Sequence, residues 1–376
     1  MTELLPPIRL TGATILRDGA LRQRSVAILR GRIGKGPLPA VDLTGYLILP
    51  GIIDMLFLPP VQGDPAARLR ACAGTAARAG ITTAWLAPRW SWSESNEPPA
   101  AAEALLDALP SRSLPDLRRA LRVESSRSDS TEALIGLCLS LRPELVYLEN
   151  RAEELDERRR QDPQALANAA VEQGMSPAAL ANLLDQAGET RRERPRHLCR
   201  LAECFESIKA RYGSIGDPCG ATREMHSMIG ASLAASPGAV SAAAAARAMG
   251  DPVLLPAMQE SRLRDLLRSR LGDALVSAGA PERLLPLALD LAGPELIDLP
   301  KLWPLLSERP AEIMHLADRG RLDLGCRADL IIVSRQTGQL EGTISAGRLI
   351  HRSGELCARF ARAGITGQGP MPMAAE

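Results

Sequence analysis

Apolar and polar positions alternate over short runs at both ends of the chain. Residues 8–48 contain the runs IRLTGATIL, SVAILRGRI and VDLTGYLILP, separated by turns such as Asp18-Gly19. Towards the other end, RADLIIVSR and TISAGRLIHRSG show the same alternation around a polar turn at Gly338. A two-residue period bounded by Gly-bearing turns is typical of β-strands. The pattern predicts a small β-unit to which both chain ends contribute.

The pattern changes between about residues 51 and 315. Short apolar runs such as ITTAWLA, LRVES and ELVYLE alternate there with longer stretches rich in Ala, Leu and Arg. In the stretch RLRDLLRSRLGDAL, four leucines recur at three- and four-residue spacing and share one helical stripe: Leu263, Leu266, Leu267 and Leu271. Strands that alternate with helices in this way imply parallel βα units, and a segment of this length is typical of a (β/α)8 barrel.

These patterns predict an α/β fold with a TIM-like (β/α)8 barrel and a small β-unit. Residues 1–50 are expected to form the N-terminal part of the β-unit, 51–315 the barrel, 316–356 the C-terminal part of the β-unit, and 357–376 a loose tail. The 45% content of apolar residues is sufficient to bury a large core over such a length.

Arginine-rich stretches recur in the middle segment. They are ERRR at 157–160, RRERPR at 191–196, and the arginines between Arg262 and Arg270. We interpret them as solvated outer faces of barrel helices, because the apolar stripe already fixes which face is buried. The alternative interpretation is a phosphate-binding face.

Composition excludes several classes of protein. Lys plus Arg number 45 against 44 Asp plus Glu, and aromatic residues make up only 3%, so the chain offers neither the basic field nor the stacking platforms of a nucleic-acid-binding protein. No apolar run approaches the roughly 20 residues of a membrane span, and the N-terminus does not have the pattern of a signal peptide. Seven scattered cysteines indicate reduced thiols and a cytoplasmic location.

Three segments together resemble the amidohydrolase superfamily of metal-dependent hydrolases. They are LPGIIDMLFL at 49–58, AGITT at 79–83, and ERPAEIMHLADRGRLDLGCRADLIIVS at 308–334. In the last of these, Gly320, Gly325, Ala328 and Asp329 have the family's spacing. The resemblance implies a (β/α)8 barrel in which the small β-unit, built from residues 1–50 and 316–356, is a β-sandwich. It also implies a hydrolase that uses one or two divalent ions such as zinc or manganese.

Within that superfamily the chain is similar to the phosphonate-catabolism enzymes that cleave ribose 1-methylphosphonate 5-triphosphate to release pyrophosphate. The similarity lies in the order and spacing of LRVE at 121–124, ELVYLEN at 144–150, GMSPAALANLLDQAGE at 174–189, 216–250 and LVSAGAP at 275–281. Few polar positions agree.

Such ions need imidazole or carboxylate ligands at the C-terminal ends of barrel strands. Where the resemblance implies two ligands on the first strand, this chain has Leu56 and Leu58, and leucine has no lone pair. Asn150 stands where a histidine follows an acid, and asparagine is a weak ligand for transition metals. Pro218 replaces another histidine, and the segment ending in Gly279 lacks the expected catalytic aspartate.

The possible remnants of the site are Glu124, Glu149, Asp217 and Cys219. A lone carboxylate cannot hold zinc tightly, because structural zinc sites depend on four ligands acting together. The chain has only four histidines, at 197, 226, 315 and 351. The sequence therefore predicts a vacated metal site, with no bound cofactor and no residue that can be named as catalytic with assurance.

A replacement site is also conceivable from the residue types. His197, Cys199, Cys204, Cys219 and His226 are chemically suitable for zinc, but Cys199 and Cys204 would lie about 140° apart around one helix. We favour buried or incidental thiols and surface histidines, and we favour a structural role over a nucleophilic one for Cys219. The tryptophans Trp85, Trp90 and Trp92 line a barrel mouth or partner surface in one interpretation and pack in the core in the other.

Three functional hypotheses remain open from the sequence. The first is a pseudoenzyme that has lost its metals and serves a binding or regulatory role. The second is an active hydrolase that uses a rearranged site, or arginines and no metal, on a phosphorylated, ribosyl triphosphate-like substrate. The third is a subunit completed by a homologous active partner. A homo-oligomer and a small phosphorylated ligand are compatible with each of them.

Overall fold

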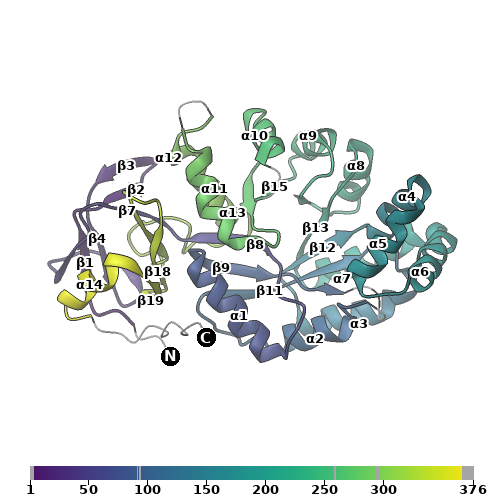
Figure 1. Ribbon diagram of the computed structural model, residues 1–376, viewed down its shortest axis with the longest axis horizontal. Helices are drawn as coiled ribbons and strands as arrows, with labels where there is room; N and C mark the ends of the chain where they lie inside the picture. The colour runs from purple at the N-terminus through teal and green to yellow at the C-terminus, as the bar shows by residue number, and fades with distance from the viewer. Residues whose placement is uncertain (1–3, 91, 93–94, 258–259, 294–295, 366–376) are drawn as a thin grey trace.

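Eight parallel strands form the centre of the molecule (Figure 1). The computed structural model describes residues 4–90, 92, 95–257, 260–293 and 296–365. The strands are paired in chain order: β8 Ile52–Phe57, β9 Ile81–Leu86, β11 Asp116–Glu124, β12 Leu145–Glu149, β13 Arg211–Ile215, β14 Ala234–Ala235, β15 Val253–Pro256 and β16 Ala274–Val276. A two-residue strand, β10 (Arg89–Trp90), pairs with β11. The amide of Ala278 donates to the carbonyl of Leu56 at 3.1 Å and brings the last strand back to the first, so the barrel is nearly closed.

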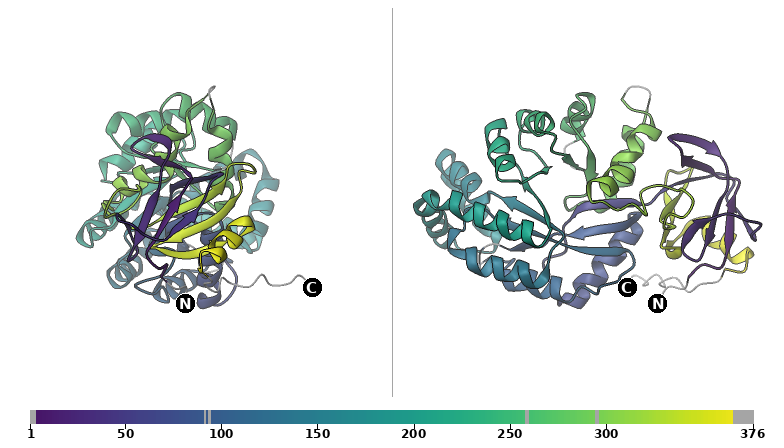
Figure 2. Two further views of the ribbon diagram at one scale, coloured as in Figure 1. Left: turned by 90° about the vertical axis from the view of Figure 1, so that its left-hand side faces the viewer. Right: turned by 180° about the vertical axis from the view of Figure 1, so that it is seen from behind.

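Helices surround these strands (Figures 1 and 2). They are α1 Pro65–Arg78, α2 Pro99–Asp107, α3 Thr131–Leu141, α7 Arg194–Ser207, α8 Gly220–Met228, α9 Val240–Met249, α10 Glu260–Arg268, α11 Leu284–Leu291, α12 Leu299–Leu302 and α13 Glu308–Ile313. Short 3₁₀ turns cover Ser128–Ser130, Thr190–Arg192, Pro281–Arg283 and Trp303–Leu306. In α10, Leu263 and Leu266 are buried and face the barrel, as their spacing predicts.

Two sheets built from both chain ends pack face to face as a β-sandwich. One has the order β5 Arg32–Gly34, β4 Val26–Leu29, β1 Ile8–Thr11 and β6 Ala40–Asp42. The other has the order β19 Arg348–Arg352, β18 Leu340–Ser345, β17 Leu330–Ser334, β7 Tyr46–Pro50, β2 Thr14–Arg17 and β3 Ala20–Gln23. The antiparallel pairing of β7 with β17 joins the two halves of the chain. The barrel and sandwich predicted from the sequence are confirmed.

The C-terminal segment differs from the expected tail. Helix α14 (Gly354–Arg362) follows β19, and its Leu356 and Phe360 are buried in the sandwich core. Ile365 is buried there too. Apolar residues at four-residue spacing therefore tie the chain to the sandwich beyond residue 357, where we had placed the start of the tail. Residues 366–376 lie outside the described part of the chain.

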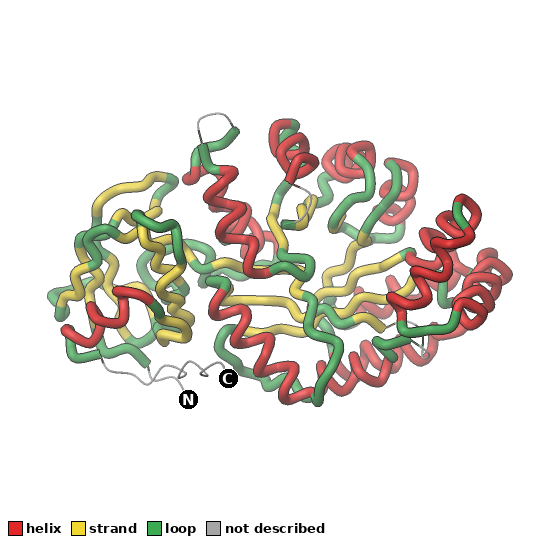
Figure 3. The backbone as a smooth tube through the Cα atoms, in the orientation of Figure 1, coloured by secondary structure: helices red, strands yellow, loops and turns green. Residues whose placement is uncertain are grey.

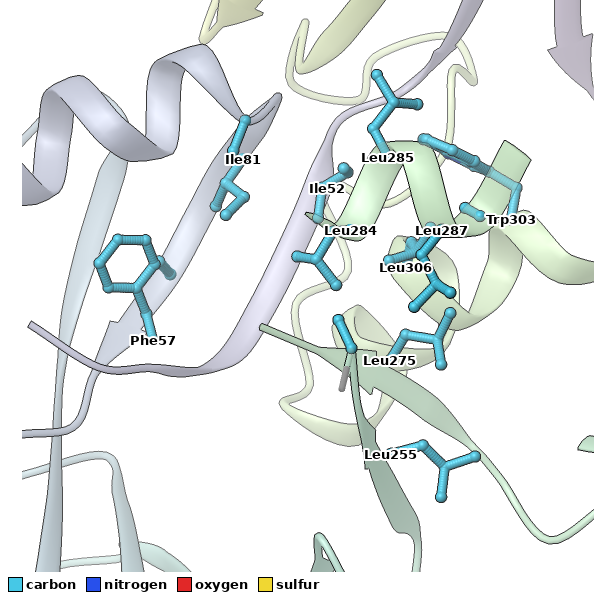
Figure 4. Packing of buried hydrophobic residues seen from close by; sticks show 14 of the residues in the cluster. Ile52, Phe57, Ile81, Leu255, Leu275, Leu284, Leu285, Leu287, Trp303 and Leu306 are labelled. Carbon is cyan, nitrogen blue, oxygen red and sulfur yellow. The ribbon is translucent and has the colours of Figure 1, made fainter. Parts of the chain in front are cut away.

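The strands of the barrel are held by apolar packing on both faces. Outside, Ile52, Ile81, Leu284 and Trp303 belong to one buried cluster between the strands and helices α1 and α11 (Figure 4). Inside, side chains fill the barrel, and the Tyr147 hydroxyl donates to the carbonyl of Met55 at 2.8 Å. The interior is therefore a packed core rather than a channel.

A buried ion network joins the sandwich to the start of the barrel strands. Arg319 donates to Asp116, at the start of β11, at 2.5 Å and to the Thr83 hydroxyl at 2.9 Å. Arg327 donates to Asp329 at 2.8 Å, and the same carboxylate accepts from the amide of Ala346 at 2.7 Å. The segment that resembles the amidohydrolases thus connects barrel to sandwich. The other end of the barrel stays free of the sandwich (Figure 2).

We expect Arg319→Met to lower the free energy of unfolding by about 3 kcal/mol, because it leaves Asp116 beside the barrel base without its closest cation. Urea unfolding followed by far-UV circular dichroism measures this. Arg321→Met is the matched control, since the Arg321 side chain is 49% exposed and pairs with Glu308 at the surface; its loss should cost less than about 1 kcal/mol. Equal effects of the two variants would contradict a structural role for the network.

Candidate functional site

The C-terminal ends of β10, β11 and β12 carry a layer of charged side chains. In the parallel pairing of β11 with β12, Arg122 lies opposite Tyr147 and Glu124 opposite Glu149. Residues two apart on a strand share one face, so Glu149 is on the same face as Tyr147, which belongs to the barrel interior. Arg89 of β10 joins these residues through its contact with Glu149. The charged layer therefore lies directly above the apolar core, where TIM barrels place their active sites.

Glu149 is clamped by two arginines. The Nε of Arg89 donates to one carboxylate oxygen at 2.7 Å, and Nη1 of Arg122 donates to the other at 3.1 Å. Arg89 also donates to Glu97 at 2.6 Å, and Arg122 to the carbonyl of Ala87 at 2.8 Å. Burial raises the pKa of Glu149, but the charges of Arg122 and Arg89 outweigh that effect and hold the pKa at about 2. Glu149 is therefore ionised at any physiological pH.

Glu124 has the opposite electrostatic environment. It is buried, with 3% of its surface exposed, and burial raises its pKa to about 7; hydrogen bonds from Ser126 lower the pKa and the charge of Glu149 raises it further. Its carboxylate accepts from the amide and hydroxyl of Ser126, at 3.2 and 2.8 Å, and from the amide of Arg151 at 3.0 Å. These bonds hold the loop after β11 and the backbone at Arg151, which begins the helix that follows β12. Glu124 thus organises the backbone.

The positions of the two missing first-strand ligands are apolar in the structure. Leu56 is buried among the side chains that fill the barrel, and Leu58 packs against the same cluster. A Cβ atom on Gly279, which has φ 103°, would lie 3.5 Å from Leu58 Cδ1. The segment after β16 therefore meets the segment after β8 at an apolar contact. Asp54 supports that junction, because its Oδ1 accepts from the amides of Leu56 and Ser277, each at 3.1 Å.

Asp217 and Cys219 belong to different surroundings from Glu124 and Glu149. Asp217 accepts from the Ser214 hydroxyl at 2.5 Å and faces His226 Nδ1 at 2.8 Å and Arg223 at 3.3 Å. This buried group packs α8 onto β13. Cys219 is exposed, and its sulfur lies 3.4 Å from the Thr222 hydroxyl, whose hydrogen bond lowers the pKa of the thiol. The structure therefore brings only two of the four predicted remnants together.

The residues considered for a replacement zinc site are not brought together. His197 is buried with Nδ1 2.7 Å from the Thr131 hydroxyl, and burial lowers its pKa to about 4. Cys204 is buried between helices and Cys199 is exposed. No group of three or more His, Cys, Asp or Glu side chains suited to a metal occurs among the described residues. His197 and His226 are both buried, so the expectation that the histidines lie at the surface was wrong for these two.

The three tryptophans are buried in three different clusters. Trp85 fills the barrel interior, and Trp90 packs between helices with its Nε1 donating to Glu103 at 2.8 Å. Trp92 packs against an inserted group of helices, described next. Of the two interpretations of these residues, core packing is the one that holds.

Three helices inserted between β12 and α7 cover the barrel mouth. They are α4 Arg151–Gln161, α5 Pro163–Gln173 and α6 Pro177–Glu189, and they lie at the end of the molecule opposite the sandwich (Figure 3). Asn150 precedes α4, and its amide donates to Glu153. Trp92 anchors the insertion through Leu155, Leu180 and neighbouring alanines. The insertion turns the strand ends into one wall of a cavity.

The cavity has a volume of about 900 Å³ and a highly charged lining. Glu149, Ile215, Gly216 and Pro218 lie on the barrel side, and α4 and α6 form the other side. Its charged residues are six arginines and five acids: Arg89, Arg151, Arg158, Arg160, Arg191, Arg194, Glu149, Glu153, Glu154, Asp156 and Glu157. Arg158, Arg160 and Arg191 are 59%, 66% and 73% exposed, so they are solvated as interpreted, but they belong to the insertion and not to barrel helices. Arg194, at the start of α7, is only 11% exposed, so the interpretation was wrong for this residue.

Sequence reasoning missed the three arginines closest to the charged layer. Arg89, Arg122 and Arg151 were not singled out, although Arg122 stands within the apolar strand LRVE two residues before Glu124. A charged residue on the inward face of a central strand is costly to bury without a partner. The position of Arg122 within an apolar strand therefore indicated a buried acidic partner, and the structure shows that this partner is Glu149 on the next strand.

No protein-family model and no curated protein matches the chain. Solved structures do match its fold. An uncharacterized protein is 12% identical over 93% of this chain and 100% of its own, with a TM-score of 0.61. Dihydropyrimidinase from Brevibacillus agri is 12% identical over 92% and 95%, with a TM-score of 0.56. Beta-aspartyl dipeptidase from Fervidobacterium islandicum, in complex with a beta-Asp-Leu dipeptide, is 14% identical over 93% and 97%, with a TM-score of 0.55.

The two named enzymes are amidohydrolase-superfamily members, so the fold implied by the sequence resemblance is confirmed. At these identities the likeness concerns the fold alone. The donor atoms at the strand ends do not fit the divalent ions that the resemblance implies. Leu56 and Leu58 offer no lone pair, both oxygens of Glu149 are held by guanidinium groups, and Glu124 accepts three hydrogen bonds from the chain.

The raised pKa of Glu124 predicts a pH dependence of stability. Its pKa is about 7 in the folded protein against 4.5 for the ordinary group, so its contribution is complete below pH 4.5 and is lost as the pH rises through 7. Relative to Glu124→Gln, the wild-type protein should therefore lose about 2.5 kcal/mol of unfolding free energy between about pH 5 and about pH 8. Urea titrations at the two pH values measure the difference.

Glu144→Gln is the control for that comparison, because Glu144 is an exposed glutamate whose side chain pairs with Arg118. Its pH dependence should run parallel to that of the wild type. A Glu124→Gln curve that also runs parallel to the wild type would show that Glu124 does not hold a proton near neutrality.

Proposed function

We propose that this protein is a non-hydrolytic relative of the amidohydrolases that binds a small molecule at the covered barrel mouth and serves a binding or regulatory role. The observation that carries the proposal is the clamp of Arg89 and Arg122 on Glu149 at the strand ends. Two fixed guanidinium groups supply the positive charge at the place where the resemblance implies metal ions.

The guanidinium group cannot replace the chemistry of a metal. A divalent ion lowers the pKa of a bound water to near 7 and so makes a nucleophile. Arginine has donors only and stays protonated in proteins, so it can orient an anion but cannot activate water or take its proton. Glu124 does not supply a base, because its oxygens are occupied by Ser126 and the amide of Arg151, and it does not line the cavity.

The apolar replacements also make physical sense without a metal. Histidines buried at the positions of Leu56 and Leu58 would have polar atoms with no partner, which is costly in a barrel interior. Leucine contributes packing instead. The sequence of the mouth is therefore consistent with a site maintained for binding and structure.

A second candidate function is a hydrolase that acts on a phosphorylated, ribosyl triphosphate-like substrate, through a rearranged site or one completed by a homologous partner. The six arginines of the cavity lining favour it, since arginine pairs bidentately with phosphate. The hydrolytic names of the dihydropyrimidinase and the dipeptidase, and the resemblance to the phosphonate-pathway enzymes, point the same way. The five acids in the same lining oppose it, because they repel a triphosphate.

We also propose that the protein is cytoplasmic and that it forms a homo-oligomer. All seven cysteines are free thiols, which supports a reducing compartment. Across the helices that the structure describes, none is both long enough and apolar enough to span a bilayer.

Metal analysis is the decisive measurement for the non-hydrolytic role. Protein produced with added zinc, manganese and iron, and then dialysed, should contain far less than one metal ion per chain by plasma mass spectrometry, because Leu56 and Leu58 provide no donor. A zinc enzyme prepared in parallel serves as the control. The protein should also fail to turn over ribosyl and nucleoside triphosphates. Stoichiometric metal, or turnover that Glu149→Gln abolishes, would refute the proposal.

A further inference from the structure

With one exception, every charged side chain that lines the cavity forms an ion pair. Each acidic side chain that α4 contributes is within 4 Å of an arginine. Glu153 contacts Arg191 and Arg194, Glu154 contacts Arg158, and both Asp156 and Glu157 contact Arg160. On the barrel side, Glu149 forms ion pairs with Arg89 and Arg122. Every acidic side chain of the lining therefore has an arginine partner.

Arg151 is the lining arginine that this pairing leaves out. Its backbone amide donates to Glu124, but within the described residues its guanidinium group forms no hydrogen bond and no ion pair. The side chain is partly buried. Burial and then the charge of Arg89 lower its pKa, and the charges of Glu149, Glu154 and Glu124 offset part of that shift. Arg151 is also the first residue of α4, where the helix dipole adds positive potential. These three carboxylates offset part of the cost of burying the cation, but none of them lies within ion-pair distance in the part of the chain that the structure describes, so the guanidinium donors are open to an anion.

We propose that the guanidinium group of Arg151 binds the carboxylate of a small hydroxylated or amino monocarboxylic acid in this cavity. The inference deepens the proposed function, on which it rests, by naming the class of ligand. The planar guanidinium group of arginine can donate two parallel hydrogen bonds to the two oxygens of a carboxylate. A volume of about 900 Å³ is within the range of small-molecule sites.

The remaining lining selects against more highly charged ligands. Six arginines against five acids give an excess of one positive charge, which a single carboxylate neutralises. A phosphate ester brings nearly two negative charges and a triphosphate more, and these would meet the carboxylates along α4. The same carboxylates are acceptors for hydroxyl or ammonium groups elsewhere on the ligand.

The first experiment measures the stability of the free protein. Arg151→Met removes a partly buried cation that has no direct ion pair and keeps the aliphatic volume, so the melting temperature should rise by about 1–3 °C. Arg158→Met is the matched control: it removes the same charge from the same cavity, but from an arginine already paired with Glu154, and it should give no rise. A fall in the melting temperature of Arg151→Met would show that Arg151 is a structural residue and would overturn the proposal.

The second experiment measures binding by calorimetry at low ionic strength. Glycerate, glycerol and glycerol 3-phosphate are probes of similar size that differ in charge. Glycerate should bind saturably and glycerol should not, and Arg151→Met should weaken glycerate binding at least about 10-fold while Arg158→Met leaves it nearly unchanged. Equal losses in both variants, tighter binding of glycerol 3-phosphate, or no saturable binding of glycerate would each overturn the inference. Neither experiment depends on metal content or turnover, so its failure is distinct from failure of the proposed function.

Discussion

The clamp of Arg89 and Arg122 on Glu149 is the interaction on which the barrel mouth depends. Glu149 lies on the inward face of β12, two residues above Tyr147 in the apolar interior, so its charge would be costly there alone. The two arginines come from the neighbouring strands β10 and β11, and each is bonded elsewhere, to Glu97 and to the carbonyl of Ala87. The clamp therefore fixes β10 against β11 and β12 as well as balancing charge.

Glu124 shows how the same layer creates two different carboxylates. It lies beside Glu149 on the adjacent strand, yet within the described residues no arginine side chain forms an ion pair with it, and it receives its hydrogen bonds from Ser126 and the amide of Arg151. Burial is then the dominant influence on Glu124 and raises its pKa to about 7, whereas the arginines hold the pKa of Glu149 at about 2. A neutral Glu124 avoids placing a second negative charge next to Glu149.

The fold could be predicted from the sequence because it follows from periodicity. The leucine stripe of α10 and the alternating runs at the chain ends produce the helices and sandwich strands where they were expected. The site was harder to predict from the sequence, for a physical reason. Arg122 and Glu149 are 27 residues apart, and the role of Arg158 depends on α4 lying over the strand ends, which no local pattern encodes. The absence of ligand atoms at Leu56 and Leu58 could be read directly, because it needs only residue identity.

The positive charge at the mouth has one further consequence. Arg89 and Arg122 are part of the chain, and they reach Glu149 through strand pairing alone. The charge of this carboxylate is therefore balanced as soon as the three strands pair during folding. Under the non-hydrolytic role proposed above, assembly of this layer would follow from folding alone and would not vary with the cell's metal supply.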